Sequence, residues 1–168
     1  MAAFVEPTSR LPLRWGRYRD RTTWGLLLVV GGTIALAGAD TFQLLILLAG
    51  TIACIVGWAI IPSDGWRRIA VAVPATLAGW LLLAGPRFVL VLVLPYLAWM
   101  LVRHRPALAW LTTGLVVAVA LVVAELVTGY GDMLAALGVE AAALAVAAAL
   151  ARGIAVRRAS RQVTARSA

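Results

Sequence analysis

Two carboxylates lie inside long apolar segments of this 168-residue chain, Glu125 and Glu140. Glu140 falls near the middle of segment 133–156, where an ionised carboxylate in hydrocarbon costs several kcal/mol unless it is paired, hydrated or protonated. Ala136 and Ala143 share its helical face, and rows of small residues line closely packed membrane helices. We therefore expect Glu140 to face protein, either as a group that handles protons or cations or as a structurally paired acid.

Glu125 lies near the end of segment 107–128, one helical turn before Thr128. Its side chain has three interpretations: it reaches the outer surface, it pairs with Arg87, or it approaches Glu140 across the last hairpin. In the third arrangement two close carboxylates share one proton. The position near the end of the segment favours the first interpretation.

Four hydroxyl residues are predicted at the depth of Glu140. Counting about 9 to 12 residues from each outer turn, at about 1.5 Å per residue, reaches the middle of a hydrocarbon core that is about 30 Å thick. Interrupted helices that meet at this depth expose backbone to substrates in many transporters, although helix kinks and packing surfaces give the same residues. The predicted substrate or ion pathway contains Glu140, Glu125, Thr33, Thr51, Thr76 and Tyr96, with helix kinks at Pro74 and Pro95.

The remaining reactive side chains do not form a catalytic pattern. The single histidine, His104, lies between Arg103 and Arg105, and the single cysteine, Cys54, lies inside an apolar run. The sequence has no cluster of His, Cys and carboxylates at metal-binding spacing and no nucleophile motif. We expect no metal, no cofactor and no catalytic residue.

Six apolar segments position these residues. Hydrophobic residues make up 63% of the chain and charged residues 13%, about half the charged fraction of a soluble domain. The sequence predicts an all-α transmembrane bundle of about six helices, arranged as three hairpins with outer turns at 38–41, 85–87 and 129–132. The expected spans are 24–39, 42–61, 69–84, 88–102, 107–128 and 133–156.

Arginines indicate the orientation of the bundle. All fifteen basic residues are Arg, and fourteen of them lie at alternate ends of the six segments, Arg87 being the exception. Short loops rich in arginine stay in the cytoplasm, so both termini are predicted to be cytoplasmic and the protein to reside in the cell membrane.

The chain divides into a basic cytoplasmic lead (1–21), which is either an interfacial helix or a disordered segment, a transmembrane domain (22–156) and a basic cytoplasmic tail (157–168). The charge of the lead and tail is explained by anionic lipid head groups, and we expect no binding of nucleic acid. The predicted lipid contacts are Arg10, Arg14, Arg17, Arg21, Arg157 and Arg158.

The middle hairpin has two alternative arrangements, because its segments are short. Segments 69–84 and 88–102 hold only 16 and 15 residues, and a helix of that length covers about 23 Å of a core of about 30 Å. Either flanking residues such as Trp66 extend the spans, or the hairpin is re-entrant. Both arrangements leave the termini on the same side.

These features leave two main functional hypotheses. The first is a non-enzymatic membrane subunit or scaffold, which binds helices of a membrane-protein partner or of a second copy. The second is a small transporter or solute-binding permease component with a site around Glu140. A membrane-embedded enzyme is disfavoured, because no nucleophile, base and orienting group can be assembled.

Overall fold

The computed structural model describes residues 7–10, 16–39, 42–127 and 129–167. Within these residues the chain is helical and has no strand, which confirms the all-α prediction. The α-helices of the described part are α1 (Tyr18–Ala37), α2 (Leu44–Ile60), α3 (Gly65–Leu81), α4 (Val93–Val102), α5 (Thr113–Leu126) and α6 (Met133–Ser167). Short 3-10 helices accompany them: η1 (Pro7–Arg10), η2 (Leu82–Ala84), η3 (Pro86–Leu92), η4 (Ala107–Thr112) and η5 (Tyr130–Asp132).

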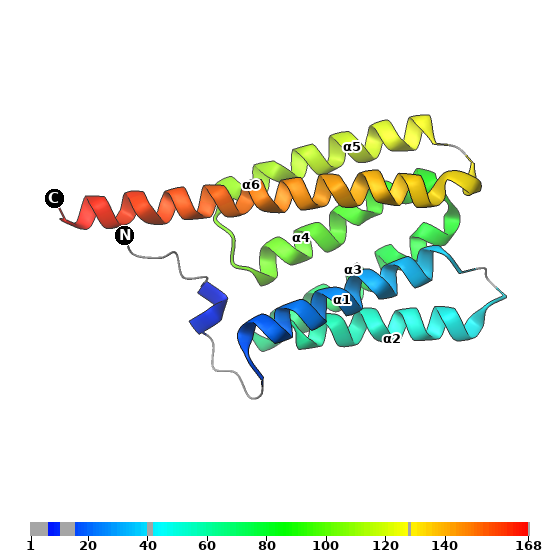
Figure 1. Ribbon diagram of the computed structural model, residues 1–168, viewed down its shortest axis with the longest axis horizontal. Helices are drawn as coiled ribbons and strands as arrows, with labels where there is room; N and C mark the ends of the chain where they lie inside the picture. Colours follow the sequence, from blue (N-terminus) through cyan, green and yellow to red (C-terminus); the bar gives the residue numbers. More distant parts are fainter. Residues whose placement is uncertain (1–6, 11–15, 40–41, 128, 168) are drawn as a thin grey trace.

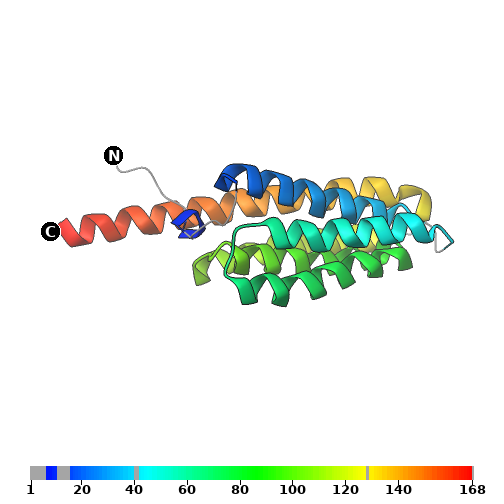
Figure 2. The same cartoon turned by 90° about the horizontal axis from the view of Figure 1, so that it is seen from below.

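The helices form a bundle in which neighbours in sequence are neighbours in space. Helices α1 and α2 lie at one side, α5 and α6 at the other, and α3 and α4 connect the two pairs (Figure 1). Helix α6 is 35 residues long, about 52 Å, and its C-terminal part extends past the end of the bundle (Figure 2). The segment predicted as a tail, 157–168, is therefore helical as far as Ser167.

Glycines hold α1 and α2 in close contact. Gly25 of α1 faces Gly57 of α2, and Gly32 faces Gly50, so the two pairs are each seven residues apart on both helices. A Cβ at Gly32 would lie 2.6 Å from the carbonyl oxygen of Gly50, and one at Gly57 would lie 2.8 Å from that of Gly25. These backbones are too close to accommodate side chains, as in small-residue packing of membrane helices.

The 3-10 helices lengthen the middle hairpin. A 3-10 helix rises about 2.0 Å per residue against about 1.5 Å for an α-helix, so the 7 residues of η3 and the 10 of α4 cover about 29 Å. Pro95 is the third residue of α4, next to the change from the 3-10 helix η3 to the α-helix. Helix α3 begins at Gly65, four residues before the predicted start, and continues through Pro74.

Three helices are long and apolar enough to cross a membrane, within the part of the chain that the structure describes: Gly65–Ala84, Ala107–Leu126 and Met133–Ser160. Two further apolar helices, Leu44–Ile60 and Arg87–Val102, are shorter. The first turn of helix α1 contains Arg19, Asp20 and Arg21, so its apolar part starts later. The protein is thus an all-helical chain with the composition of a membrane protein, while the six crossings and the orientation of the termini stay predictions.

Candidate functional site

Glu140 lies on the buried face of α6. Its side chain is fully buried (0% exposed), in line with the buried residues Ala136 and Ala143. No hydrogen-bond partner for Oε1 or Oε2 occurs among the described residues. Enclosing an ionised carboxylate without a partner is costly, so this acid is the most unusual buried group of the described chain.

Two hydrophobic clusters enclose the buried face of α6 on either side of Glu140. Ala136 belongs to a cluster with Val89 of η3 and Ala120 of α5. Ala147 belongs to another, with residues of α4 and α5. Glu140 lies between them along the helix, so the surroundings of its carboxyl group are mainly apolar.

Tyr96 belongs to the second of these clusters, and its hydroxyl group is hydrogen-bonded to Thr112 and not to Glu140. It is 3% exposed, and its hydroxyl lies 2.6 Å from Oγ1 of Thr112. Thr112 in turn donates a hydrogen bond to the carbonyl oxygen of Ala109. Tyr96 therefore joins α4 to η4, with its hydroxyl already satisfied.

The three predicted threonines lie on the other side of the molecule. The hydroxyls of Thr33, Thr51 and Thr76 each donate to the backbone carbonyl four residues earlier in the same helix, at 2.7 to 2.8 Å. Thr33 also lies 3.7 Å from Sγ of Cys54, at the contact of α1 with α2. Thr51 and Thr76 line a groove between α2 and α3.

The predicted mid-depth layer is therefore divided among separate places. Thr33 lies between α1 and α2, and Thr51 and Thr76 lie between α2 and α3. Tyr96 of α4 and Glu140 of α6 lie in the other half of the bundle. Glu125 and Pro74 are exposed on their helices, and Pro95 is half-buried. These residues do not surround one common cavity.

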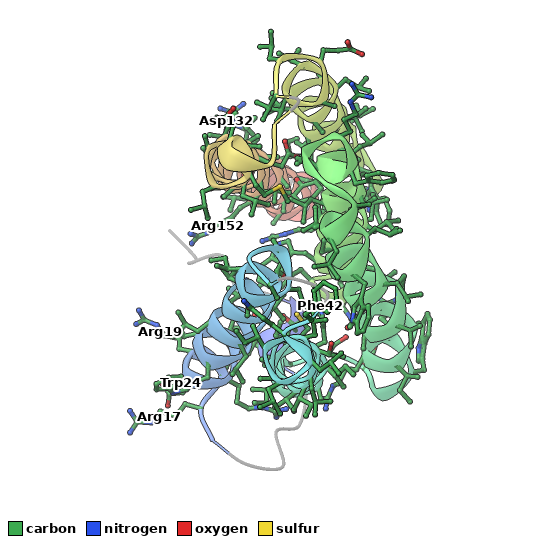
Figure 3. All side chains as sticks on the ribbon, turned by 90° about the vertical axis from the view of Figure 1, so that its right-hand side faces the viewer. Arg17, Arg19, Trp24, Phe42, Asp132 and Arg152 are labelled. Carbon is green, nitrogen blue, oxygen red and sulfur yellow. The ribbon has the colours of Figure 1, made fainter. Side chains whose placement is uncertain are left out.

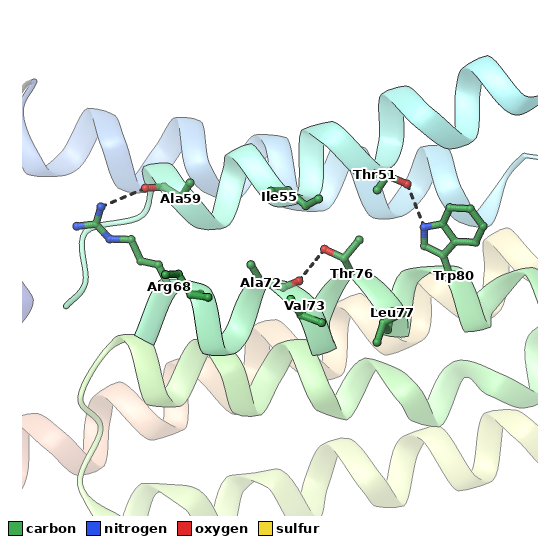
Figure 4. Close-up of a pocket in the computed structure, with 10 residues that line it drawn as sticks. Thr51, Ile55, Ala59, Arg68, Ala72, Val73, Thr76, Leu77 and Trp80 are labelled. Carbon is green, nitrogen blue, oxygen red and sulfur yellow. Dashed lines mark hydrogen bonds between the residues drawn. The ribbon is translucent and has the colours of Figure 1, made fainter. Parts of the chain in front are cut away.

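The groove between α2 and α3 (the α2–α3 groove) has a volume of about 470 Å³. Arg68 lies at one end, and at the other the indole N–H of Trp80 donates to Oγ1 of Thr51 at 3.0 Å (Figure 4). The walls between these ends are apolar, and their side chains are exposed toward the outside of the bundle. They include Ile55 and Ala59 of α2 and Ile69, Val73 and Leu77 of α3.

Arginines bind the carbonyl groups at helix C-termini at the arginine-rich end of the bundle. Arg21 is 4% exposed and its Nε donates to the carbonyl oxygen of Ile60, at the end of α2. Burial, together with the neighbouring Arg68 guanidinium, lowers the pKa of Arg21 below its ordinary value. Arg67 donates to the carbonyl oxygen of Leu101, at the end of α4. Guanidinium groups are favourable there because a helix C-terminus carries partial negative charge.

The arginines predicted to contact lipid head groups differ in exposure. Arg17 is exposed on the outside of the bundle (Figure 3), as are Arg157 and Arg158 on α6, whereas Arg21 is buried. Arg14 lies outside the described residues, and the side chain of Arg10 is not described. The contact of these arginines with lipid stays a prediction.

The outward surface of α6 (the α6 outer face) is made of small residues. A Cβ added at Gly138 or Gly153 would meet no atom within 4 Å. By contrast, the outward residues of α2 are large, such as Leu45 and Leu48. The α6 outer face consists of Ala135, Gly138, Ala142, Ala145, Ala149 and Gly153, all exposed.

Sequence reasoning missed this face and the α2–α3 groove. Alanine occurs on every side of α6, so composition alone did not distinguish this face, but the spacing of three or four residues between its members was visible. Trp80 was a second signal, because the other six tryptophans lie near a predicted inner end and Trp80 does not. Comparison of the chain with protein-family models, with curated proteins and with solved structures gave no match.

Proposed function

We propose that the protein is a non-enzymatic, multi-pass subunit of the cell membrane, which binds a transmembrane helix of a partner protein along the α6 outer face. The supporting observation is the exposed row of small residues on α6. Without an apolar driving force between helices in lipid, association depends on close packing, which small residues permit. Outward residues on α2 are large, as expected where a helix faces lipid.

The other small-residue contacts of the bundle are already used internally. Gly25 and Gly32 of α1 pack against Gly57 and Gly50 of α2, so these four glycines are not available to a partner. The α6 outer face is free of such internal contacts at Gly138. A partner helix therefore fits there better than on α1 or α2.

The positive charge at the C-terminal end of α6 favours an acidic partner. Beyond the bundle, α6 continues as a basic helix with Arg157 and Arg158 exposed. Two copies in the same membrane share one orientation, so pairing through α6 would place like charges side by side, which is unfavourable. The proposed partner helix therefore continues into an acidic cytoplasmic segment.

The candidate reactive groups support a non-enzymatic role. Nε2 of His104 lies 3.4 Å from the carboxylate of Asp64 in the connecting segments, and Cys54 is buried between α1 and α2. Glu140 lies on α6, inside the other half of the bundle. These groups sit on different elements, so no nucleophile, base and orienting group converge among the described residues.

A second candidate function is transport of protons or cations through Glu140. The observation that favours it is the buried carboxyl group without a described partner. Against it, the four hydroxyl residues do not share a cavity with this acid. The test is Glu140→Gln in proteoliposomes that contain a pH reporter, because an unchanged proton flux would remove this carboxylate from any mechanism.

Photo-crosslinking in native membranes tests the proposed subunit role. A photoreactive amino acid is placed at Ala142, on the α6 outer face, and in a matched control at Ile52, an exposed position on α2. We expect a product of one discrete mass from position 142 only, and a weaker product when Arg157 and Arg158 are changed to Glu.

Three results would overturn the proposal. The first is the absence of a discrete product at position 142, and the second is an equal product at position 52. The third is a product with the mass of two copies of this chain, which would replace the foreign partner by self-association.

A further inference from the structure

The α2–α3 groove has the features of a lipid site, and it lies on other helices than the α6 outer face. We infer that it holds one acyl chain of an anionic phospholipid, whose phosphate group binds Arg68. Three properties of the groove support this occupant: the charge at its head, its dimensions and its closed far end.

The head of the groove carries positive charge that the described residues do not neutralise. Nε and Nη2 of Arg68 donate to the carbonyl oxygen of Ser63, and Nη1 donates to that of Ala59. These three bonds use three of the five N–H donors of a guanidinium group, so two remain for phosphate oxygens. Both acceptors, the carbonyl oxygens of Ser63 and Ala59, are neutral.

The nearest acidic residue of this loop is engaged elsewhere. Asp64 lies 3.7 Å from Nε of Arg67 and 3.4 Å from Nε2 of His104. Arg68 thus holds a fixed position while keeping its full charge. A phosphate group is the complementary partner, since guanidinium and phosphate form strong charge-assisted hydrogen bonds.

The groove is about as long as one leaflet is deep. Arg68 and Trp80 are twelve residues apart on α3, about 18 Å, and one leaflet of a bilayer core is about 15 Å deep. An acyl chain whose head group binds at Arg68 therefore has the length to follow the apolar walls as far as Trp80.

Trp80 and Thr51 close the far end. Their hydrogen bond satisfies the indole N–H, which would otherwise be unpaired in an apolar environment. The ring then presents apolar surface to the end of the groove. Because the walls on either side are apolar and open outward, a chain can enter from the bilayer.

The experiment uses the full-length protein, purified in mild detergent and stripped of lipid. Native mass spectrometry then measures binding of phosphatidylglycerol and, separately, of phosphatidylcholine. Arg68→Gln is compared with Arg152→Gln, which removes the same charge from an exposed position on α6. Val73→Trp, which fills the groove, is compared with Ala70→Trp at an exposed position of α3 outside the lining.

We expect the native protein to retain one phosphatidylglycerol molecule in preference to phosphatidylcholine. Arg68→Gln should weaken this binding by about tenfold or more, as the loss of charge-assisted hydrogen bonds predicts, and Arg152→Gln should weaken it less. Val73→Trp should abolish retention while Ala70→Trp preserves it. Thermal unfolding of each variant confirms that the fold is intact.

The inference is wrong if Val73→Trp retains phosphatidylglycerol as the native protein does, or if the two lipids bind equally. Full competition by water-soluble glycerol phosphate would also contradict it, since the acyl chain would then contribute nothing. These results concern α2 and α3 only, and they leave the crosslinking test on α6 unaffected.

Discussion

Replacing Gly32 with alanine should destabilise the bundle, although alanine is the better helix former. The new Cβ would lie 2.6 Å from the carbonyl oxygen of Gly50 and 2.8 Å and 2.9 Å from Sγ and N of Cys54. Two of these three atoms belong to the backbone of α2 and have no rotamer to change. Relief to an ordinary contact of 3.4 Å therefore requires α1 and α2 to separate by about 0.8 Å.

The magnitude follows from two opposing terms. Overpacking a well-packed contact costs about 1 to 3 kcal/mol, and exchanging Gly for Ala inside a helix returns up to about 1 kcal/mol. The net expectation is a loss of up to about 2 kcal/mol in the free energy of unfolding. Gly31→Ala is the matched control, because a Cβ at Gly31 meets no atom within 4 Å. This control should be neutral or slightly stabilising.

The assay is reversible unfolding in mixed detergent micelles, followed by tryptophan fluorescence. The difference between the two variants is the informative quantity, since both change Gly to Ala in the same helix at adjacent positions. If Gly32→Ala were as stable as Gly31→Ala, the close contact of α1 with α2 would be refuted.

Two further predictions concern buried charged residues. Glu140→Met should raise the free energy of unfolding by about 1 to 3 kcal/mol, because it removes a buried polar group that has no described partner. The same substitution at the exposed Glu125 should change the free energy of unfolding little. A loss of stability at position 140 would reveal a stabilising partner. Arg21→Gln should lower the free energy of unfolding by about 1.5 to 3 kcal/mol, because the carbonyl group of Ile60 loses a charged donor. Arg17→Gln is the control at an exposed position, and equal unfolding curves for the two arginine variants would contradict the buried contact.

The positions of the helices were predictable because each apolar segment is bounded by Gly, Pro or Arg. The lengths of the helices were less predictable. Segment 88–102 was judged short at a rise of about 1.5 Å per residue, but the chain winds as a 3-10 helix before Pro95 and gains length. The start of α3 at Gly65 was missed because Arg67 and Arg68 suggested a loop. Arg67 instead binds the carbonyl group of Leu101 near the end of α4, and Arg68 binds those of Ser63 and Ala59.

The candidate site was harder to predict than the helices. Depth along a segment is readable from a sequence, but the direction of each side chain is not, so residues at one level were grouped although they face different neighbours. Thr33 and Thr51 illustrate this, since both hydroxyls bind their own helix backbone. The groove beside Thr51 depends on how α2 and α3 diverge, which no local pattern encodes.

The central claim is a membrane-spanning bundle whose arginine-rich ends lie in the cytoplasm, and labelling of single cysteines in intact cells tests it most directly. Cys54 is 2% exposed, so the native thiol gives little background. Cysteines at Arg87, Asp132 and Arg157 are treated with a membrane-impermeant reagent before and after permeabilisation. The account predicts that positions 87 and 132 react in intact cells and that position 157 reacts only after permeabilisation. Reaction of position 157 in intact cells, or protection of position 87, would contradict it.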